Sequence, residues 1–232
     1  MRHNNKSTFV IIITMFIIFY SSKIGLSLEE NNNIFIKNGS REEKKIALTF
    51  DDGPHPKETH EILDILDKYN VKATFFVVGK HANWYSEPLK RAAKEGHEIG
   101  NHTFSHPDIS NLGSDDIKRE IKECEETLEK LTCKKTTLFR PPYGSYRQEK
   151  LAEIAKECGY KIILWTTIDV KDWKNPPPSQ ISDIIINKVQ NGDIILLHDY
   201  GTENTVKALE VIIPTMMKKG YEFVTVSELI NE

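Results

Sequence analysis

Short apolar runs alternate with amphipathic segments from Lys45 to the end of the chain, and this alternation restricts the fold most strongly. The apolar runs include residues 46–50, 74–78 and 193–197, and patterns of helical spacing, such as residues 58–70, lie between them. Repeated strand–helix alternation predicts a parallel sheet whose connections are helices. About seven such units fit a single α/β domain, a distorted (β/α) barrel of seven or eight units. An open doubly wound sheet is the alternative.

The segments between the runs carry ordinary helix signals. Residues 114–131 form the longest amphipathic pattern, and Ser114 is expected to be its N-cap. Gly96 and Gly159 each follow a further pattern, at the position where helices commonly end. These signals favour a helix after most of the predicted strands.

A different pattern opens the chain. Basic residues precede an apolar run over residues 9–20, which is typical of a secretory signal and short for a membrane span. No clear cleavage site follows. Residues 1–27 are therefore expected to be a signal peptide or an N-terminal membrane anchor, with a buried core helix as the less favoured alternative. Residues 28–43 are polar and Asn-rich, as in a spacer, and residues 44–232 are expected to form the catalytic domain.

The charge of the chain argues against nucleic acid as a partner. The chain has 31 Lys and Arg and 34 Asp and Glu, which gives a formal net charge of −3, and it has no dense cluster of basic residues. Residues 1–27 contain basic residues but no acidic ones, so their removal would make the net charge of the remainder more negative. Cys124, Cys133 and Cys158 match no metal-binding framework, so free thiols are expected, with a Cys124–Cys133 disulfide as the alternative.

Polar side chains follow five of the predicted strands. Asp51 and Asp52 end the first run, and two like charges in one site repel each other unless a cation compensates them. Because strand ends share one rim of a parallel barrel, the groups at all five run ends are expected to converge there. The other four run ends carry these groups: His102 with His106, Arg140, Asp169 and His198.

The spacing of His102 and His106 suggests a metal site. A helical turn or a tight turn brings two such imidazoles together. With one carboxylate they supply three ligands and leave open positions, a set that suits zinc, cobalt, nickel or iron. One of Asp51 and Asp52 would bind the metal, and the other would act as a base on water. An isolated pair of this spacing is more often two surface histidines, but the neighbouring carboxylates favour the metal site here.

The remaining strand-end groups fit a hydrolytic reaction. Arg140 would keep a catalytic carboxylate ionised, and the Pro-Pro-Tyr-Gly turn after it would present backbone N–H groups to an oxyanion. His198 would serve as a general acid that Asp169 orients. Trp173 and Tyr143 would form a wall for a sugar ring, with a place in the core as the ordinary alternative.

Five motifs in this order resemble the polysaccharide deacetylases, the NodB-homology domain of carbohydrate esterase family 4. The resemblance covers about residues 44–230, and the set is far more specific than any one motif. The motifs are TFDDGP at 49–54, HTFSH at 102–106, RPPYG at 140–144, DVKDW at 169–173 and LLH at 196–198.

The resemblance implies a distorted (β/α) barrel and a metal-dependent N-deacetylase. It makes Asp51 the catalytic base and makes Asp52, His102 and His106 the ligands of one divalent metal ion. Zinc is the expected metal, with cobalt, nickel and iron as alternatives. The spacing of the two aspartates alone does not distinguish the base from the ligand.

The same resemblance implies roles for residues around this centre. Arg140 would hold the base, and Asp169 would tune His198 as the general acid. The groups expected to meet the substrate are the backbone N–H of Tyr143 and the side chains of Trp173 and Leu196.

The implied reaction removes the N-acetyl group from an N-acetylglucosamine unit and releases acetate. An exported protein would find peptidoglycan or chitin oligomers outside the cell, in the cell wall or at the outer face of the cytoplasmic membrane. Two alternatives remain, a non-catalytic carbohydrate-binding, spore or cell-wall protein and an amidase for a small substrate. The sequence does not distinguish N-acetylglucosamine from N-acetylmuramic acid or give the oligomeric state.

Overall fold

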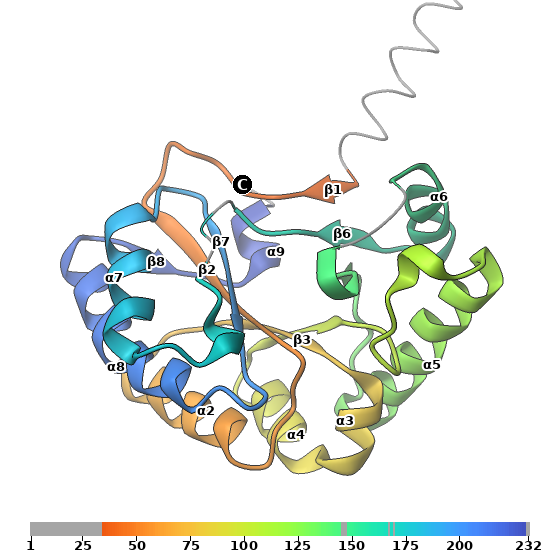
Figure 1. The fold of residues 1–232 in the computed structure, drawn as a ribbon, viewed down its shortest axis with the longest axis horizontal. Helices are drawn as coiled ribbons and strands as arrows, with labels where there is room; N and C mark the ends of the chain where they lie inside the picture. The colour runs from red at the N-terminus through yellow and green to blue at the C-terminus, as the bar shows by residue number, and fades with distance from the viewer. Residues whose placement is uncertain (1–33, 145–147, 167, 169, 231–232) are drawn as a thin grey trace, which may run out of the picture.

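A curved sheet of parallel strands forms the centre of the computed structural model, which describes residues 34–230 except 145–147, 167 and 169 (Figure 1). Over these residues the strand order is β1-β6-β5-β4-β3-β2-β7, and β8 pairs with β2. Every pair of strands is parallel. The strands are β1 (Phe35–Ile36), β2 (Lys45–Asp51), β3 (Thr74–Val77), β4 (Glu98–Asn101), β5 (Leu138–Phe139), β6 (Lys161–Ile163), β7 (Ile194–His198) and β8 (Glu222–Phe223).

The two ends of this sheet approach each other. Asn38, which follows β1, forms an antiparallel bridge with Asp193, which precedes β7. Beyond β6, the backbone N–H of Thr166 donates to the carbonyl oxygen of Ile194 at 3.1 Å. The sheet therefore curls into a distorted (β/α) barrel, which confirms the predicted fold class.

Helices connect the parallel strands, and most of them lie around the outside of the sheet (Figure 1). The short helix α9 instead shares a buried apolar cluster with residues of five strands, so it fills one end of the barrel. The helices are α2 (Glu58–Lys68), α3 (Gly79–Trp84), α4 (Ser86–Lys94), α5 (Ser114–Thr132), α6 (Gln148–Cys158), α7 (Pro178–Lys188), α8 (Glu203–Lys218) and α9 (Val226–Ile230), with 3-10 turns at Ile109–Asn111, Pro142–Gly144 and Asp172–Lys174.

Strand β2 shows how this packing positions the site. Ile46, Leu48 and Phe50 are buried in the large cluster that also contains residues of α2 and α8. Ala47 belongs to the separate cluster with α9. Because successive side chains of a strand point to opposite faces, Asp51 faces the barrel interior, as Ala47 does. The side chain of Asp51 therefore lies inside the barrel at the carboxyl end of β2.

Part of the segment expected to be a spacer belongs to the folded domain. Phe35–Ile36 pair with β6, and Arg41 forms an ion pair with the buried Asp193. Residues of the expected spacer therefore pack against the sheet, and the boundary at residue 44 stays a prediction. The signal or anchor predicted over residues 1–27 lies outside the described residues and stays a prediction.

Two helix expectations also change. Helix α5 begins at Ser114 itself, while Gly113 occupies the N-cap position without a side-chain hydrogen bond. Asp115 and Asp116 instead place negative charge in the first turn, where it stabilises a helix. Helix α3 has no counterpart among the predicted elements, because its sequence GKHANW lacks an amphipathic period.

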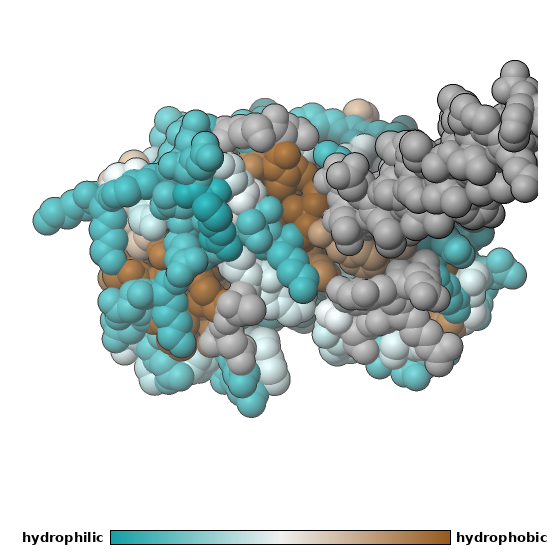
Figure 2. Space-filling model, turned by 90° about the horizontal axis from the view of Figure 1, so that it is seen from above, coloured by the Kyte–Doolittle hydropathy of each residue, from teal (hydrophilic) through white to brown (hydrophobic). Residues whose placement is uncertain are grey.

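No helix within the described part of the chain has the length and apolar character needed to cross a membrane. Cys124, Cys133 and Cys158 are free thiols, as predicted. Seen from above in Figure 2, hydrophilic residues cover much of the coloured surface, and apolar atoms gather in patches between them.

Candidate active site

The chain turns sharply where β2 ends, and this turn brings two neighbouring carboxylates to one place. Asp52 has a φ of 75°, in the left-handed region that side chains other than glycine rarely adopt. In a continuing strand the two carboxylates would point to opposite faces. Here Nε2 of His102 lies 3.8 Å from Oδ2 of Asp51 and 3.4 Å from Oδ1 of Asp52. Both acids therefore face the same site.

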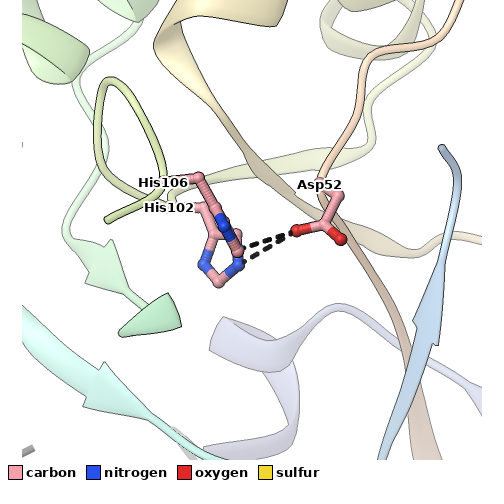
Figure 3. Close-up of side chains that lie close together, drawn as sticks. All are labelled: Asp52, His102 and His106. Atoms are coloured by element: carbon pink, nitrogen blue, oxygen red, sulfur yellow. Dashed lines mark ion pairs between the residues drawn. The ribbon is translucent and has the colours of Figure 1, made fainter. Parts of the chain in front are cut away.

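Asp52, His102 and His106 form a cluster suited to a metal ion (Figure 3). Their ligand atoms all lie within 4.8 Å of one another. Nε2 of His106 is 3.1 Å from Oδ1 of Asp52, the same oxygen that His102 approaches. One carboxylate oxygen and two imidazole nitrogens are the donor set of a catalytic zinc site with an open position. The residues present therefore fit a divalent metal.

Neighbouring groups hold the two histidines in this arrangement. Nδ1 of His102 is 2.7 Å from the carbonyl oxygen of Arg140, which leaves Nε2 directed at the aspartates. The segment from His102 to His106 is a turn rather than a helix, with φ values of 67° at Thr103 and 60° at His106. The hydroxyl of Thr103 accepts a hydrogen bond from the His106 backbone N–H at 3.1 Å. The turn therefore folds back on itself and presents both imidazoles together.

The electrostatics of the cluster favour opposite charges. Burial acts to raise the pKa of Asp52, but hydrogen bonds to His102 and His106 hold it well below its usual range. Burial acts to lower the pKa of His102, and the charges of Asp51 and Asp52 raise it overall. Asp52 is therefore ionised at neutral pH, as a ligand of a cation must be.

Arg140 anchors the first aspartate inside the barrel. Its guanidinium is 0% exposed and donates to Oδ1 of Asp51 at 2.7 Å. The same nitrogen donates to Oγ1 of Thr49 at 2.8 Å, and the other two nitrogens reach the backbone oxygens of Ile163 and Leu164 at 3.2 Å. Burial lowers the pKa of Arg140, while Asp51 counteracts that shift. This hydrogen bonding holds the Asp51 carboxylate in one orientation.

His198 lies beside the aspartate pair, on the neighbouring strand. It is the register partner of Asp51 in the pairing of β2 with β7. Its Nδ1 is 2.8 Å from Oδ1 of the buried Asp172, whose other oxygen accepts from the His198 backbone N–H at 2.8 Å. Burial acts to lower the pKa of His198, but Asp172 raises it to about 9. His198 is therefore protonated at neutral pH and equipped to donate a proton from Nε2.

Among the described residues, the carboxylate that contacts His198 is Asp172, which the sequence had not singled out. Asp169 was expected in this position, and it lies outside the described residues. The structure gives the contact to Asp172, which the hydroxyl of Thr205 also binds at 2.8 Å. Both acids belong to the motif DVKDW, so the motif was the correct signal. The role expected of Asp169 stays a prediction.

The residues expected to contact substrate lie around this centre. Tyr143 is 67% exposed, and its ring packs edge-on against His106 with a centroid distance of 4.7 Å. Trp173 is 57% exposed and follows Asp172 directly. Leu196 is half-buried and precedes His198 by two residues, so both side chains point to the same face of β7. These positions leave aromatic and apolar surface available next to the polar groups.

Comparisons with known proteins agree with this geometry. The polysaccharide deacetylase family model matches residues 38–163. A peptidoglycan-N-acetylglucosamine deacetylase of Bacillus cereus is 44% identical over 82% of this chain and 89% of its own length. The peptidoglycan-N-acetylmuramic acid deacetylase PdaC of Bacillus subtilis is 40% identical over 81% of this chain and 39% of its own.

Solved structures give the same result. The crystal structure of the peptidoglycan N-acetylglucosamine deacetylase Bc1960 superimposes with a TM-score of 0.83 at 36% identity, covering 89% of this chain and 96% of that one. BA3943 of Bacillus anthracis, described as a CE4 family pseudoenzyme, superimposes with a TM-score of 0.80 at 31% identity, covering 85% and 69%. Sequence, fold and site geometry together establish that the chain belongs to the polysaccharide deacetylase family, carbohydrate esterase family 4.

Proposed function

We propose that this protein hydrolyses the N-acetyl group of N-acetylglucosamine units in peptidoglycan and releases acetate. The observation that carries the proposal is the arrangement of two acid–base groups beside one set of potential metal ligands. Asp51, held by Arg140, and His198, held by Asp172, occupy paired positions on adjacent strands. Such an arrangement can remove a proton and deliver another within one active site.

The two groups would act in sequence. The Asp51 carboxylate accepts a proton from the attacking water, and Arg140 holds that carboxylate in place. The protonated His198 then donates its Nε2 proton to the departing sugar nitrogen, which leaves as an amine. The backbone N–H of Tyr143 would donate to the oxygen that gains negative charge.

Asp52, His102 and His106 would hold the metal, for which we propose zinc. When bound, the metal supplies Lewis-acid polarisation of the amide and lowers the pKa of water. Cobalt, nickel and iron accept the same nitrogen and oxygen ligands. Reconstitution with each metal in turn, followed by rate measurement, ranks them.

The choice of peptidoglycan rests on the relatives and the N-terminal pattern. Two similar proteins bear the names of peptidoglycan deacetylases, one for N-acetylglucosamine and one for N-acetylmuramic acid. The predicted signal or anchor over residues 1–27 would place the domain outside the cytoplasm, in reach of the cell wall. Chitin oligomers offer the same acetamido group and are the alternative substrate.

A non-catalytic role is the second candidate, because the similar protein BA3943 is described as a pseudoenzyme. Shared fold therefore does not guarantee activity. Catalysis is favoured here because Asp51 is paired with Arg140, His198 lies opposite Asp51 on the neighbouring strand, and the three potential metal ligands form one cluster.

Acetate release from purified peptidoglycan and from N-acetylglucosamine oligomers tests the proposal. The protein is stripped with a chelator, assayed, and assayed again after zinc is added. We expect release only with metal and a higher rate on peptidoglycan. Absence of release from both polymers by protein that contains stoichiometric metal would exclude the proposed activity.

A further inference from the structure

We propose that an aromatic cluster beside the metal site binds a second sugar ring of the substrate strand. The cluster comprises Trp84 at the end of α3, His81 one turn earlier, and Tyr200 in the loop after β7. It lies outside the five motifs. The inference deepens the proposed function, on which it rests, by assigning a place to a sugar unit next to the one that reacts.

The first argument is the exposure of Trp84. Among residues 34–230 apart from the undescribed positions, five large hydrophobic side chains are strongly exposed, and two of them, Val211 and Met217, lie on the outer helix α8. The other three are aromatic: Trp84, Tyr143 and Trp173. Isolated exposed apolar side chains are common, but three large rings beside one polar site indicate a surface that a ligand covers.

The second argument is that His81 links Trp84 to the metal site. Nδ1 of His81 lies 2.6 Å from the backbone carbonyl oxygen of Asp52. The imidazole of His81 and the indole of Trp84 have centroids 5.4 Å apart, with 32° between their planes. The indole is therefore one aromatic ring removed from the backbone of Asp52, which carries a proposed metal ligand.

The third argument is that the cluster is held in place before any ligand binds. His81 stacks on Tyr200 at 4.3 Å with an interplanar angle of 16°. His55 packs edge-on against Tyr200, with a centroid distance of 5.0 Å. The ammonium of Lys80 lies 5.4 Å from the centroid of the Trp84 indole. A surface that is already ordered loses less entropy on binding than a mobile one.

The chemistry of the occupant follows from the lining. A pyranose ring presents C–H groups on its face, which pack against an indole, and hydroxyl groups at its edge, which face water or polar side chains. Trp84 is 56% exposed and supplies the large flat apolar surface. A pyranose unit of the same glycan strand is therefore the ligand that the cluster fits, connected covalently to the unit at the metal site.

Calorimetric titration with a hexamer of N-acetylglucosamine tests the subsite in the full-length protein. We expect Trp84→Ala to raise the Kd of the hexamer about fivefold, the scale of one lost aromatic contact. Trp84→Phe should retain most of the affinity. Val211→Ala, at an exposed position on α8, is the matched control and should leave the Kd unchanged.

The affinity for zinc is measured on the same variants, because His81 links Trp84 to Asp52. If Trp84 contacts sugar, Trp84→Ala leaves zinc affinity unchanged while hexamer affinity falls. An unchanged hexamer Kd, or a loss that a weakened zinc site accounts for, would overturn the subsite. This result is separate from the proposed function, which fails if the wild-type protein binds the hexamer and zinc but releases no acetate.

Discussion

The two ends of the barrel interior have opposite chemistry although the same strands form both. At one end Ala47, Ile194 and Leu229 pack in an apolar cluster with α9. At the other end, Thr49 and Asp51 lie on the same face of β2 as Ala47. Both accept hydrogen bonds from the buried Arg140. The first residues of a strand can therefore stabilise the fold while its last residues take part in catalysis. Substitutions at the two ends should therefore separate the contribution to catalysis from the contribution to stability.

Removal of the buried cation should have the largest combined effect on rate and stability. Arg140→Met leaves Asp51 without its partner inside the barrel, and we expect acetate release to fall about 100-fold. Breaking a buried pair also destabilises the fold, by about 3–5 kcal/mol, because one charge stays buried alone. Rate measurement and urea unfolding check the two effects.

Lys68→Met is the matched control for this substitution. Lys68 forms an ion pair with Glu210 at 2.6 Å, and both side chains are largely exposed. Solvent screens such a pair, so neither the unfolding midpoint nor the rate should change measurably. An equal loss of stability in both variants would contradict the importance assigned to burial.

Asp172→Asn should have an intermediate effect that depends on pH. Asp172 raises the pKa of His198 to about 9, so the wild-type enzyme keeps its acid protonated up to that pH and loses activity above it. Without the negative charge the pKa of His198 should fall toward about 6.5. At pH 8 the protonated fraction, and with it the rate, should then decrease about 30-fold.

The pH–rate profile and the titration of His198 by NMR measure this shift. The basic limb should move to lower pH in the variant, and the rate near pH 6 should stay close to that of the wild-type enzyme. An unmoved basic limb would show that another group supplies the proton.

Leu229→Ala, at the apolar end, should have the smallest effect on catalysis. Leu229 is 2% exposed in the cluster with α9, and the cavity left behind should destabilise the fold by about 2–5 kcal/mol. Below the unfolding transition, kcat and KM should match the wild-type values. A specific loss of kcat would mean that the two ends of the barrel are coupled.

Much of the site could be predicted from the residues that follow each apolar run, because parallel strands end at one rim of the barrel. Asp51, Asp52, His102, Arg140 and His198 each follow an apolar run that a single sequence reveals, and the structure places them together. Their chemical roles stay predictions until variants are measured.

The rest of the site depends on backbone turns that carry no such signal. Asp172 reaches His198 from a turn whose flanking residues, Lys171 and Asn175, both have a φ of 51°. Neither residue is glycine, the residue that most strongly signals a left-handed conformation. His81 was missed for a related reason, because α3 is too short to show an amphipathic pattern.

Asp51→Asn tests the central claim most directly, since it changes one atom of the proposed base. The variant keeps the shape of the side chain and leaves Asp52, His102 and His106 intact. We predict that it binds one zinc ion per chain with wild-type affinity but releases acetate about 1,000-fold more slowly. Acetate release near the wild-type rate by the zinc-loaded variant would contradict the assignment of Asp51 as the base.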